Sequence, residues 1–416
     1  MKVGIAGYGV VGKTRHRSIE SNTSYQITAI SESSQEARKF IPAGIKIYND
    51  YKSLIASADI DVMFISLPNQ FASEAACLSL QRGLHVFCEK PPARTHAELL
   101  EVEKQSLKFP DLKLMYGFNH RFHLSVEEAK LLIDSNSLGR LINMKGVYGK
   151  SQMISFNQTD WRTKREDSGG GILLDQGIHM LDLIRYLSAE NFTEVFSFID
   201  NAFWNFDVED NAYVLMKSAN GVVAQLHSSA TQWRHVFNLE ITMEKGSLIL
   251  GGLLTGSKSY GDETLTIITA DLEKDNGVPH ENISQFNEDV SWDNEIKYFS
   301  DSLQNNSPIL RGNIDDAIET MRLIERIYKA DPIWRDKFYD YFPKNYSDIN
   351  FSDGFNSLPT KNAIKHHLSI NQIELLESRF YFDKSFLIIG QKKEKLKTIY
   401  KKKINFIAQI HENIWN

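Results

Sequence analysis

Short apolar runs alternate with amphipathic stretches over roughly the first 120 residues. Lys2–Ala6, Asp61–Ser66 and Leu84–Cys88 are almost continuously apolar, whereas Val10–Asn22 and Phe71–Arg82 carry apolar residues at helical spacing. Strands that are apolar on both faces and alternate with helices are typical of a parallel sheet covered on both sides. The pattern predicts a doubly wound α/β domain over residues 1–122. Further strands are expected at Gln26–Ser31 and Leu112–Gly117, and a further helix at Thr95–Leu107.

The period of the pattern changes after Arg121. A predicted helix, Leu124–Ser135, precedes a strand at Leu141–Tyr148, and between residues 194 and 250 apolar residues alternate with polar ones. Turn sequences such as Asn220-Gly221 separate these runs, as in an antiparallel sheet. An amphipathic helix at Ile314–Lys329 closes this part. Residues 123–334 are therefore expected to form a second α/β domain with a large, mostly antiparallel sheet. Its clearest strands are Ala212–Lys217, Val222–His227 and Phe237–Glu244.

The last segment, residues 335–416, differs from the rest in charge. It holds 14 basic and 9 acidic residues, whereas the preceding residues hold 33 basic and 44 acidic. Gln391–Lys403 alone carries seven lysines against one glutamate. We predict an appended, mostly helical basic segment of unknown role. Its simplest interpretation is a solvated helix face; the alternative is a helix that docks on a partner or an anionic membrane, with Phe406, Ile407 and Trp415 as apolar anchors.

The composition of the 416 residues is that of a globular protein, with 42% apolar and 24% charged residues. No apolar run approaches the roughly 18 residues that an integral membrane span needs. Cys77 and Cys88 are too few for a disulfide framework or a four-cysteine zinc site, so a reducing, cytoplasmic location and no bound metal are expected. The net charge of −6 argues against nucleic-acid binding across the protein.

A glycine-rich turn follows the first predicted strand. Gly7, Gly9 and Gly12 give the pattern G-x-G-x-x-G as GYGVVG, at the start of a helix. This pattern suits a dinucleotide, because it allows a tight turn, close backbone approach to the pyrophosphate, and a helix N-terminus that faces the anion. Glu32 ends the next strand, where its carboxylate would accept hydrogen bonds from the ribose and repel a 2′-phosphate. NAD is therefore expected as cofactor in preference to NADP. Tyr8, Val10 and Val11 complete the expected turn.

Two further places carry candidate chemistry. Lys90, in Glu89-Lys90-Pro91-Pro92, follows a strand and so lies at the edge of the sheet where ligands bind. Burial beside a nicotinamide cation would lower its pKa into a useful acid–base range. Asp175 and His179 are four residues apart in a predicted helix that follows Gly169–Gly171, so the carboxylate is expected to orient the imidazole. The alternatives are a lysine paired with Glu89 and a histidine that is only structural.

Four ordered motifs together resemble the Gfo/Idh/MocA family of sugar and inositol dehydrogenases over about residues 1–330: GYGVVG, Glu89-Lys90-Pro91, GFNHRF and GGGILLDQGIHMLD. The resemblance implies an N-terminal Rossmann domain and a second domain whose sheet forms a homodimer or homotetramer. It implies hydride transfer between nicotinamide and a secondary alcohol of a sugar, nucleotide sugar or cyclitol. Lys90, Asp175 and His179 would be the catalytic residues, with either Lys90 or His179 as the direct proton carrier.

The same resemblance assigns binding residues. For the cofactor it implies a turn that resembles the family's Thr-Pro-Asn, although the histidine often found three residues after its asparagine is Ala72 here. This turn is Ser66, Leu67, Pro68 and Asn69, and Glu89, Lys90 and Asn119 join it. For the substrate, the assigned residues are Trp161, Arg162, Asp175, His179 and Arg234. The two arginines would clamp an anionic or polyhydroxylated substrate, or else form ion pairs with nearby acids.

Three functions fit this sequence. The first is an NAD(P)-dependent sugar or inositol dehydrogenase. The second is a relative that retains NAD and cleaves a glycosidic bond through transient oxidation. The third is a non-catalytic NAD-binding scaffold or sensor that works through its C-terminal segment. The joint presence of Lys90, Asp175 and His179 favours an enzyme, since a scaffold has no chemical need for all three.

Overall fold

The computed structural model describes residues 1–151, 160–255, 259–270 and 278–341, with four short stretches at 374–376, 381–382, 385–386 and 389–391. The chain separates into two compact units, Met1–Trp334 and Arg335–Asn416. Within the described ranges, no helix is both long and apolar enough to cross a bilayer.

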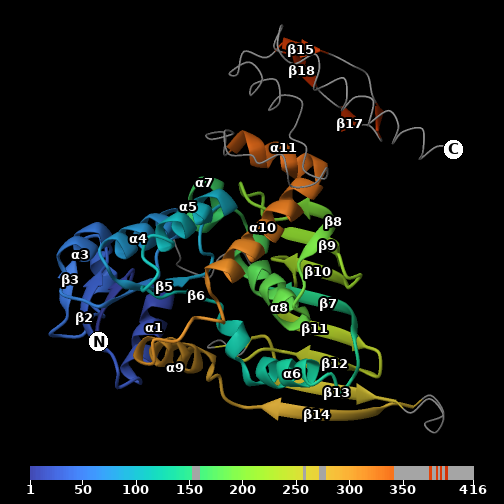
Figure 1. Ribbon diagram of the computed structural model, residues 1–416, viewed down its shortest axis with the longest axis horizontal. Helices are drawn as coiled ribbons and strands as arrows, with labels where there is room; N and C mark the ends of the chain where they lie inside the picture. Colours follow the sequence, from blue (N-terminus) through green and yellow to red (C-terminus); the bar gives the residue numbers. More distant parts are fainter. Residues whose placement is uncertain are drawn as a thin grey trace. The chain divides into compact units, whose positions relative to one another are not determined.

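The N-terminal part of the first unit is a six-stranded sheet in the order β3-β2-β1-β4-β5-β6, with all neighbours parallel (Figure 1). This confirms the predicted doubly wound arrangement. The strand order reverses between β1 and β4, and ligands of such sheets bind at the carboxyl ends of the strands beside this reversal. The strands are β1 (Lys2–Ala6), β2 (Gln26–Ser31), β3 (Lys46–Tyr48), β4 (Val62–Ile65), β5 (His85–Glu89) and β6 (Leu114–Gly117). The helices are α1 (Val10–Glu20), α2 (Gln35–Arg38), α3 (Tyr51–Ser57), α4 (Asn69–Gln81) and α5 (His96–Ser106).

The second sheet has eight strands in the order β14-β13-β12-β11-β7-β10-β9-β8. Its described neighbours pair antiparallel, except that β7 and β10 are parallel. The strands are β7 (Leu141–Gly149), β8 (Phe192–Asp200), β9 (Asn211–Ser218), β10 (Val223–Ser229), β11 (Val236–Met243), β12 (Gly246–Gly251), β13 (Glu263–Thr269) and β14 (His280–Phe286). Helices α6 (Leu124–Asp134), α8 (Ile178–Ser188) and α10 (Ile314–Ala330) cover one face (Figure 1). This confirms the predicted large, mostly antiparallel sheet.

One helix of the second region belongs to the core of the first. In α9 (Ser291–Gln304), Phe299 packs edge-on against Phe64 of β4 and Phe87 of β5, with ring centroids 6.0 and 5.5 Å apart. Ile296 and Leu303 join the same buried cluster. The two domains are therefore not divided by one cut at residue 122, because the chain returns to the first sheet after completing the second.

The second unit is described only in part. Short antiparallel pairs join β15 (Glu374–Leu376) to β18 (Ile389–Gln391) and β16 (Tyr381–Phe382) to β17 (Ser385–Phe386). These described stretches are strands, unlike the helices that the sequence pattern predicts for this segment. The lysine-rich stretch after Gln391, and the residues Phe406, Ile407 and Trp415, lie outside the described residues. Helix α11 (Pro332–Tyr341) spans the boundary between the units.

Candidate active site

The glycine turn after β1 has the shape that a dinucleotide needs. Gly7 has a φ of +87°, and a Cβ atom there would lie 2.4 Å from the carbonyl oxygen of Ser66. A Cβ at Gly12 would lie 2.1 Å from the carbonyl oxygen of Gly7, so α1 packs directly against the turn. At Gly9, by contrast, no described atom lies within 4 Å of the added Cβ. The turn is thus tight on its inner side and open at Gly9.

The N-terminus of α1 faces that open side without a protein cap. Gly9 is its N-cap residue, no described side chain accepts a hydrogen bond from the first turn, and that turn contains no acidic residue. Free N–H groups at a helix N-terminus favour an anion. Together with the open space at Gly9, they fit the pyrophosphate of NAD. Around the same turn Tyr8 is buried, Val11 half-buried and Val10 exposed.

Glu32 is held beside this turn at the end of β2. Its two carboxylate oxygens accept hydrogen bonds from the backbone N–H groups of Tyr8 and Ser34, both at 2.8 Å. Arg38 of α2 folds back and donates from Nε to the carbonyl oxygen of Glu32 at 2.6 Å. The acid is therefore fixed beside the glycine turn, and an arginine that was not predicted from the sequence lies next to it.

The segment after β4 connects the two domains. Ser66 approaches Gly7 closely, Leu67 lies 3.4 Å from a Cβ placed there, and Pro68 is the N-cap residue of α4. Asn69 donates from Nδ2 to the carbonyl oxygen of Ser168 at 2.7 Å. The Asn69 side chain therefore reaches into the second domain, and it lines a pocket there.

Lys90 follows β5 and lies at the junction of the domains. Its Nζ donates to the backbone carbonyl of Asp175 at 2.7 Å and lies 3.6 Å from Oδ1 of the same residue. Burial lowers the pKa of Lys90 below its ordinary value, and Asp175 and Glu89 oppose that effect only in part. The lysine is thus an ammonium group that gives up its proton more readily than usual. Burial acts on Lys90 in the predicted direction, whereas the predicted neighbourhood of a nicotinamide cation stays a prediction.

A buried ion network fixes the strand end that carries Lys90. Arg15 of α1 lies between the rings of Phe87 and Trp292, with its guanidinium carbon 4.5 and 4.2 Å from the two ring centroids. Its Nε contacts a carboxylate oxygen of Glu89, and its Nη2 lies 2.5 Å from one of Glu295 in α9. Burial raises the pKa of Glu295 to about 8, although Arg15 acts in the opposite direction. Three elements thereby hold Glu89-Lys90 in place.

Asp175 is surrounded by cations. Lys150, at the end of β7, donates from Nζ to its Oδ2 at 3.0 Å, while Lys90 approaches Oδ1. Burial acts to raise the pKa of Asp175, but Lys150, Lys90 and Arg162 outweigh it and hold that pKa well below its usual range. Asp175 is therefore a permanent carboxylate, and its charge holds two lysines together.

The glycine run before Asp175 allows three close contacts. Gly169 has a φ of +85°, and a Cβ there would lie 2.4 Å from the carbonyl oxygen of Arg94. A Cβ at Gly170 would lie 2.1 Å from the hydroxyl of Tyr328, and one at Gly171 would lie 2.0 Å from the carbonyl oxygen of Glu209. The buried carboxylate of Glu209 accepts the N–H groups of Gly171 and Leu173 at 2.8 and 3.0 Å. The start of this turn is therefore rigidly placed.

His179 differs from the sequence-based expectation. Asp175 lies in a π-helical turn, Leu173–Gly177, which precedes α8 and widens the spacing between side chains four residues apart. Among the described residues, the carboxylate bonds to Lys150 rather than to His179, and Nδ1 of His179 has no hydrogen-bond partner. The expectation that Asp175 orients the imidazole is thus not met. The His179 ring instead stacks on His120, with centroids 3.7 Å apart and planes at 11°.

A small pocket opens beside Asp175. Arg162 stacks over the ring of Trp161, with its guanidinium carbon 4.3 Å from the ring centroid. Arg234 is exposed in the turn after β10, and within the described part of the chain no contact joins it to these residues. The structure thus brings Trp161 and Arg162 to the site but not Arg234. The pocket is lined by Asn69, Trp161, Arg162, Ser168, Gly170, Gly171, Ile172 and Asp175.

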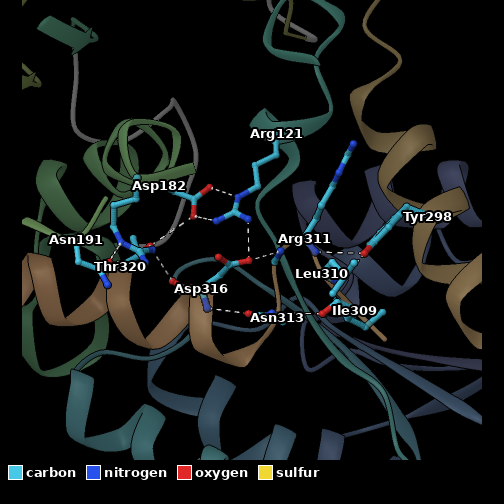
Figure 2. Close-up of polar contacts among 12 residues, drawn as sticks. Arg121, Asp182, Asn191, Tyr298, Ile309, Leu310, Arg311, Asn313, Asp316 and Thr320 are labelled. Atoms are coloured by element: carbon cyan, nitrogen blue, oxygen red, sulfur yellow. Dashed lines mark hydrogen bonds and ion pairs between the residues drawn. The ribbon is translucent and has the colours of Figure 1, made fainter. Parts of the chain in front are cut away.

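The GFNHRF segment, residues 117–122, forms hydrogen bonds to helices α8, α9 and α10. Arg121 is almost fully buried and forms two hydrogen bonds of 2.7 Å to Asp182 of α8 and one of 2.7 Å to Asp316 of α10 (Figure 2). Asp182 therefore serves the packing of α8 through Arg121. Asn119 donates to Ser291 of α9 at 3.2 Å, so its side chain points between the domains.

Three residues with contacts around the site were not predicted from the sequence, namely Lys150, His120 and Arg15. A signal for Lys150 exists, because it lies two residues after the predicted strand Leu141–Tyr148, but nothing in the sequence pairs that strand with Asp175. His120 lies in the GFNHRF motif, in which only Asn119 was predicted to belong to the site.

The fold and the glycine turn define a dinucleotide-binding domain joined to a second α/β domain, and comparison with known proteins gives the family. Residues 1–111 match the family described as "Oxidoreductase family, NAD-binding Rossmann fold", and residues 126–249 match the "GFO/IDH/MocA C-terminal domain". The chain belongs to the Gfo/Idh/MocA family, and residues 1–111 are its NAD-binding Rossmann domain.

Similar proteins include levoglucosan dehydrogenase of Pseudarthrobacter phenanthrenivorans, 29% identical over 48% of this chain and 58% of its own length. D-glucoside 3-dehydrogenase of Escherichia coli is 26% identical over 66% of this chain and 84% of its own length. A solved structure of levoglucosan dehydrogenase in complex with NADH is 21% identical and superposes with a TM-score of 0.70, over 80% of this chain and 97% of that chain. The match thus spans less than two thirds of the first of these relatives.

Proposed function

We propose that the chain is an NAD-dependent dehydrogenase that acts on a secondary alcohol of a sugar or cyclitol. NAD, when bound, supplies a nicotinamide ring that accepts or donates a hydride. The observation that carries the proposal is the pairing of Lys90 with Asp175, whose side chain lines the pocket, with His179 near enough for the charge of Lys90 to lower its pKa.

The protein's own residues would handle the hydroxyl proton. Burial, together with the charges of Lys90 and His123, lowers the pKa of His179 well below its usual range, so the imidazole is neutral near pH 7 and able to accept a proton. Lys90 would hydrogen-bond the same substrate oxygen and polarise it. Asp175 would keep Lys90 in place as a fixed counter-charge, and either Lys90 or His179 would carry the proton directly.

The substrate class follows from the pocket and the relatives together. The pocket presents the Asn69 amide, the Arg162 guanidinium and the Asp175 carboxylate beside one indole, a mixture that suits a polyhydroxylated ring. The two relatives are named for levoglucosan and D-glucosides, and another, inositol 2-dehydrogenase of Salmonella typhimurium, for a cyclitol. Glu32, fixed beside the turn, supports NAD over NADP.

Assembly into a homodimer or homotetramer is proposed through the open face of the second sheet. Phe196 and Phe198 of β8 are 71% and 77% exposed, and Tyr213 and Leu215, their cross-strand neighbours on β9, are 49% and 50% exposed. A contiguous apolar surface of this kind marks an interaction site. Both cysteines are free thiols, which supports the proposed cytoplasmic location.

The test is an NAD reduction screen with the purified protein against aldoses, glucosides, anhydrosugars, cyclitols and nucleotide sugars, with Lys90→Met in parallel. We expect NADH to form with one substrate class and only in the wild type. Mass spectrometry of small molecules released on denaturation shows whether NAD is retained. NAD that stays bound and is never reduced by any substrate would contradict the proposal and favour internal redox chemistry or a scaffold.

A further inference from the structure

His179 is held mainly by another histidine. Its side chain is almost fully buried, and its Nδ1 has no hydrogen-bond partner among the described residues. The nearest ring is that of His120, stacked face to face at 3.7 Å; Tyr148 lies farther away, at 6.5 Å between centroids. The orientation of the His179 ring therefore depends on whatever fixes His120.

His120 is fixed by a chain of hydrogen bonds that begins at a carboxylate. Ser291 donates its hydroxyl to Oδ1 of Asp289 at 2.7 Å, so its oxygen is left to accept. Asn119 lies 3.2 Å from that oxygen through Nδ2 and must donate to it. The amide oxygen of Asn119 then faces Nδ1 of His120 at 3.2 Å. Because an amide oxygen only accepts, Nδ1 of His120 carries the proton.

The other nitrogen of His120 completes the chain. Nε2 lies 3.0 Å from the hydroxyl of Tyr148 on β7. With the proton on Nδ1, a neutral ring accepts at Nε2, so Tyr148 donates to it. For a neutral His120, the hydrogen bonds from Asp289 to Tyr148 therefore run in one consistent direction, and they join α9, the turn after β6 and the second sheet. It defines both the orientation and the tautomer of His120.

We propose that His120 is a positioning residue for His179: its neutral ring, locked by the chain from Asp289 to Tyr148, presents a flat face that holds the His179 imidazole ready to exchange a proton with the substrate hydroxyl. This rests on the proposed function in one respect, namely that His179 takes part in proton transfer. A neutral stacked ring also tolerates the positive charge that His179 gains on accepting a proton, whereas a charged His120 would repel it.

Three titratable groups face this pair of histidines. Lys90 lies after β5, and Tyr148 lies on β7. His123 directly follows the turn that holds His120. His123 is itself paired through Nδ1 with Oε2 of Glu263 at 2.7 Å. Any pH profile of the variants below therefore includes a contribution from Lys90.

The first test is independent of activity and of cofactor. Imidazole ¹⁵N spectra of the full chain, with the His120 signals identified by their loss in His120→Phe, report the protonated nitrogen directly. We expect a proton on Nδ1 and no change of charge from about pH 8 to pH 5, a range in which an unperturbed histidine titrates. A proton on Nε2, or a titration near pH 6.5, would overturn the assignment.

The second test separates positioning from packing. His120→Leu removes the flat ring, and we expect kcat to fall about 100-fold, the cost of a misplaced catalytic group, while KM and the Kd for NAD change less than about twofold. His120→Phe keeps a flat ring and should recover part of that loss. His85→Leu, a half-buried histidine at the opposite end of β5, is the matched control and should keep the wild-type kcat.

The outcomes distinguish this inference from the proposed function. If His179→Ala abolishes turnover but His120→Leu keeps the wild-type kcat, the positioning role is wrong and the proposed function stands. If no substrate is oxidised by the wild type, the proposed function fails, and the spectra still decide the tautomer and charge of His120. If His120→Leu does not fold, His120→Phe and the spectra carry the test.

Discussion

At the dinucleotide turn the backbone of one contiguous segment makes the site, whereas at the Lys90 junction charged side chains converge from four separate elements. The turn depends on missing side chains: Gly7 and Gly12 pack where a Cβ would collide, and Gly9 leaves space. The junction depends on charges that need one another, since Asp175 holds Lys90 and Lys150. This difference predicts that NAD affinity is sensitive to added side-chain volume at the glycine turn. It also predicts that kcat is sensitive to charge and pH at the Lys90 junction.

The largest effect is expected when the shared carboxylate is removed. Asp175→Leu leaves Lys90 and Lys150 buried without their counter-charge, so we expect a loss of about 3 kcal/mol in the free energy of unfolding and a fall in kcat of at least about 100-fold. Urea denaturation and steady-state kinetics measure the two. Asp175→Asn, which keeps the shape, is the control. Wild-type stability in both variants would show that the lysines do not depend on this charge.

The NAD affinity of the glycine turn should depend on the volume of the side chains placed in it. Gly9→Ala places a methyl group in space that is open in the protein, so we expect an unchanged melting temperature but an NAD Kd raised about 10-fold or more. Gly12→Ala, whose Cβ would lie 2.1 Å from the Gly7 carbonyl oxygen, should weaken binding and also lower the melting temperature. Calorimetry and thermal unfolding give both numbers. Equal effects in the two variants would refute the division between inner and open sides.

The buried network behind Lys90 should make stability depend on pH. The pKa of Glu295 is raised from 4.5 to about 8, so the folded protein binds this proton more tightly than the unfolded chain does. The contribution is present below about pH 4.5 and is lost as pH rises toward 8, at up to about 1.4 kcal/mol per pH unit. Glu295→Gln should remove this slope from unfolding curves measured between these values. An identical slope in the variant would assign it to other groups.

The smallest effect is expected at the ribose end of the turn. Glu32→Ala removes a carboxylate that would repel a 2′-phosphate and leaves Arg38 nearby. We expect the ratio of kcat/KM for NAD over NADP to fall about 10-fold, which corresponds to roughly 1.4 kcal/mol. Glu36→Ala, on the exposed part of α2, is the control. An unchanged ratio would mean that other residues read the ribose.

The difference between the two regions also explains what the sequence could predict. Gly7, Gly9, Gly12 and Glu32 act through local geometry, and their spacing after a strand was enough to place them. Both sheets followed from the period of the apolar pattern. The pairing of Lys150 with Asp175 depends on strand order in the second sheet, which no local pattern encodes.

Two further features of the structure could not be predicted from the sequence, for physical reasons. The π-helical turn that carries Asp175 breaks the four-residue spacing on which its contact with His179 was predicted. Helix α9 joins the first core from the far end of the second domain because its apolar face fits Phe64 and Phe87, a match that only the tertiary structure shows. Arg234 was expected to clamp the substrate or to form an ion pair, and the structure leaves it exposed.

The most direct measurement compares NAD binding with turnover in Lys90→Met, using the substrate that the screen identifies. Because Lys90 bonds to Asp175 at the junction and not to the glycine turn, the variant should bind NAD with a Kd within about twofold of wild type, while kcat falls about 1,000-fold. Full turnover in Lys90→Met would contradict the assignment of catalysis to this junction. A parallel loss of NAD binding and turnover would contradict the separation of the two regions.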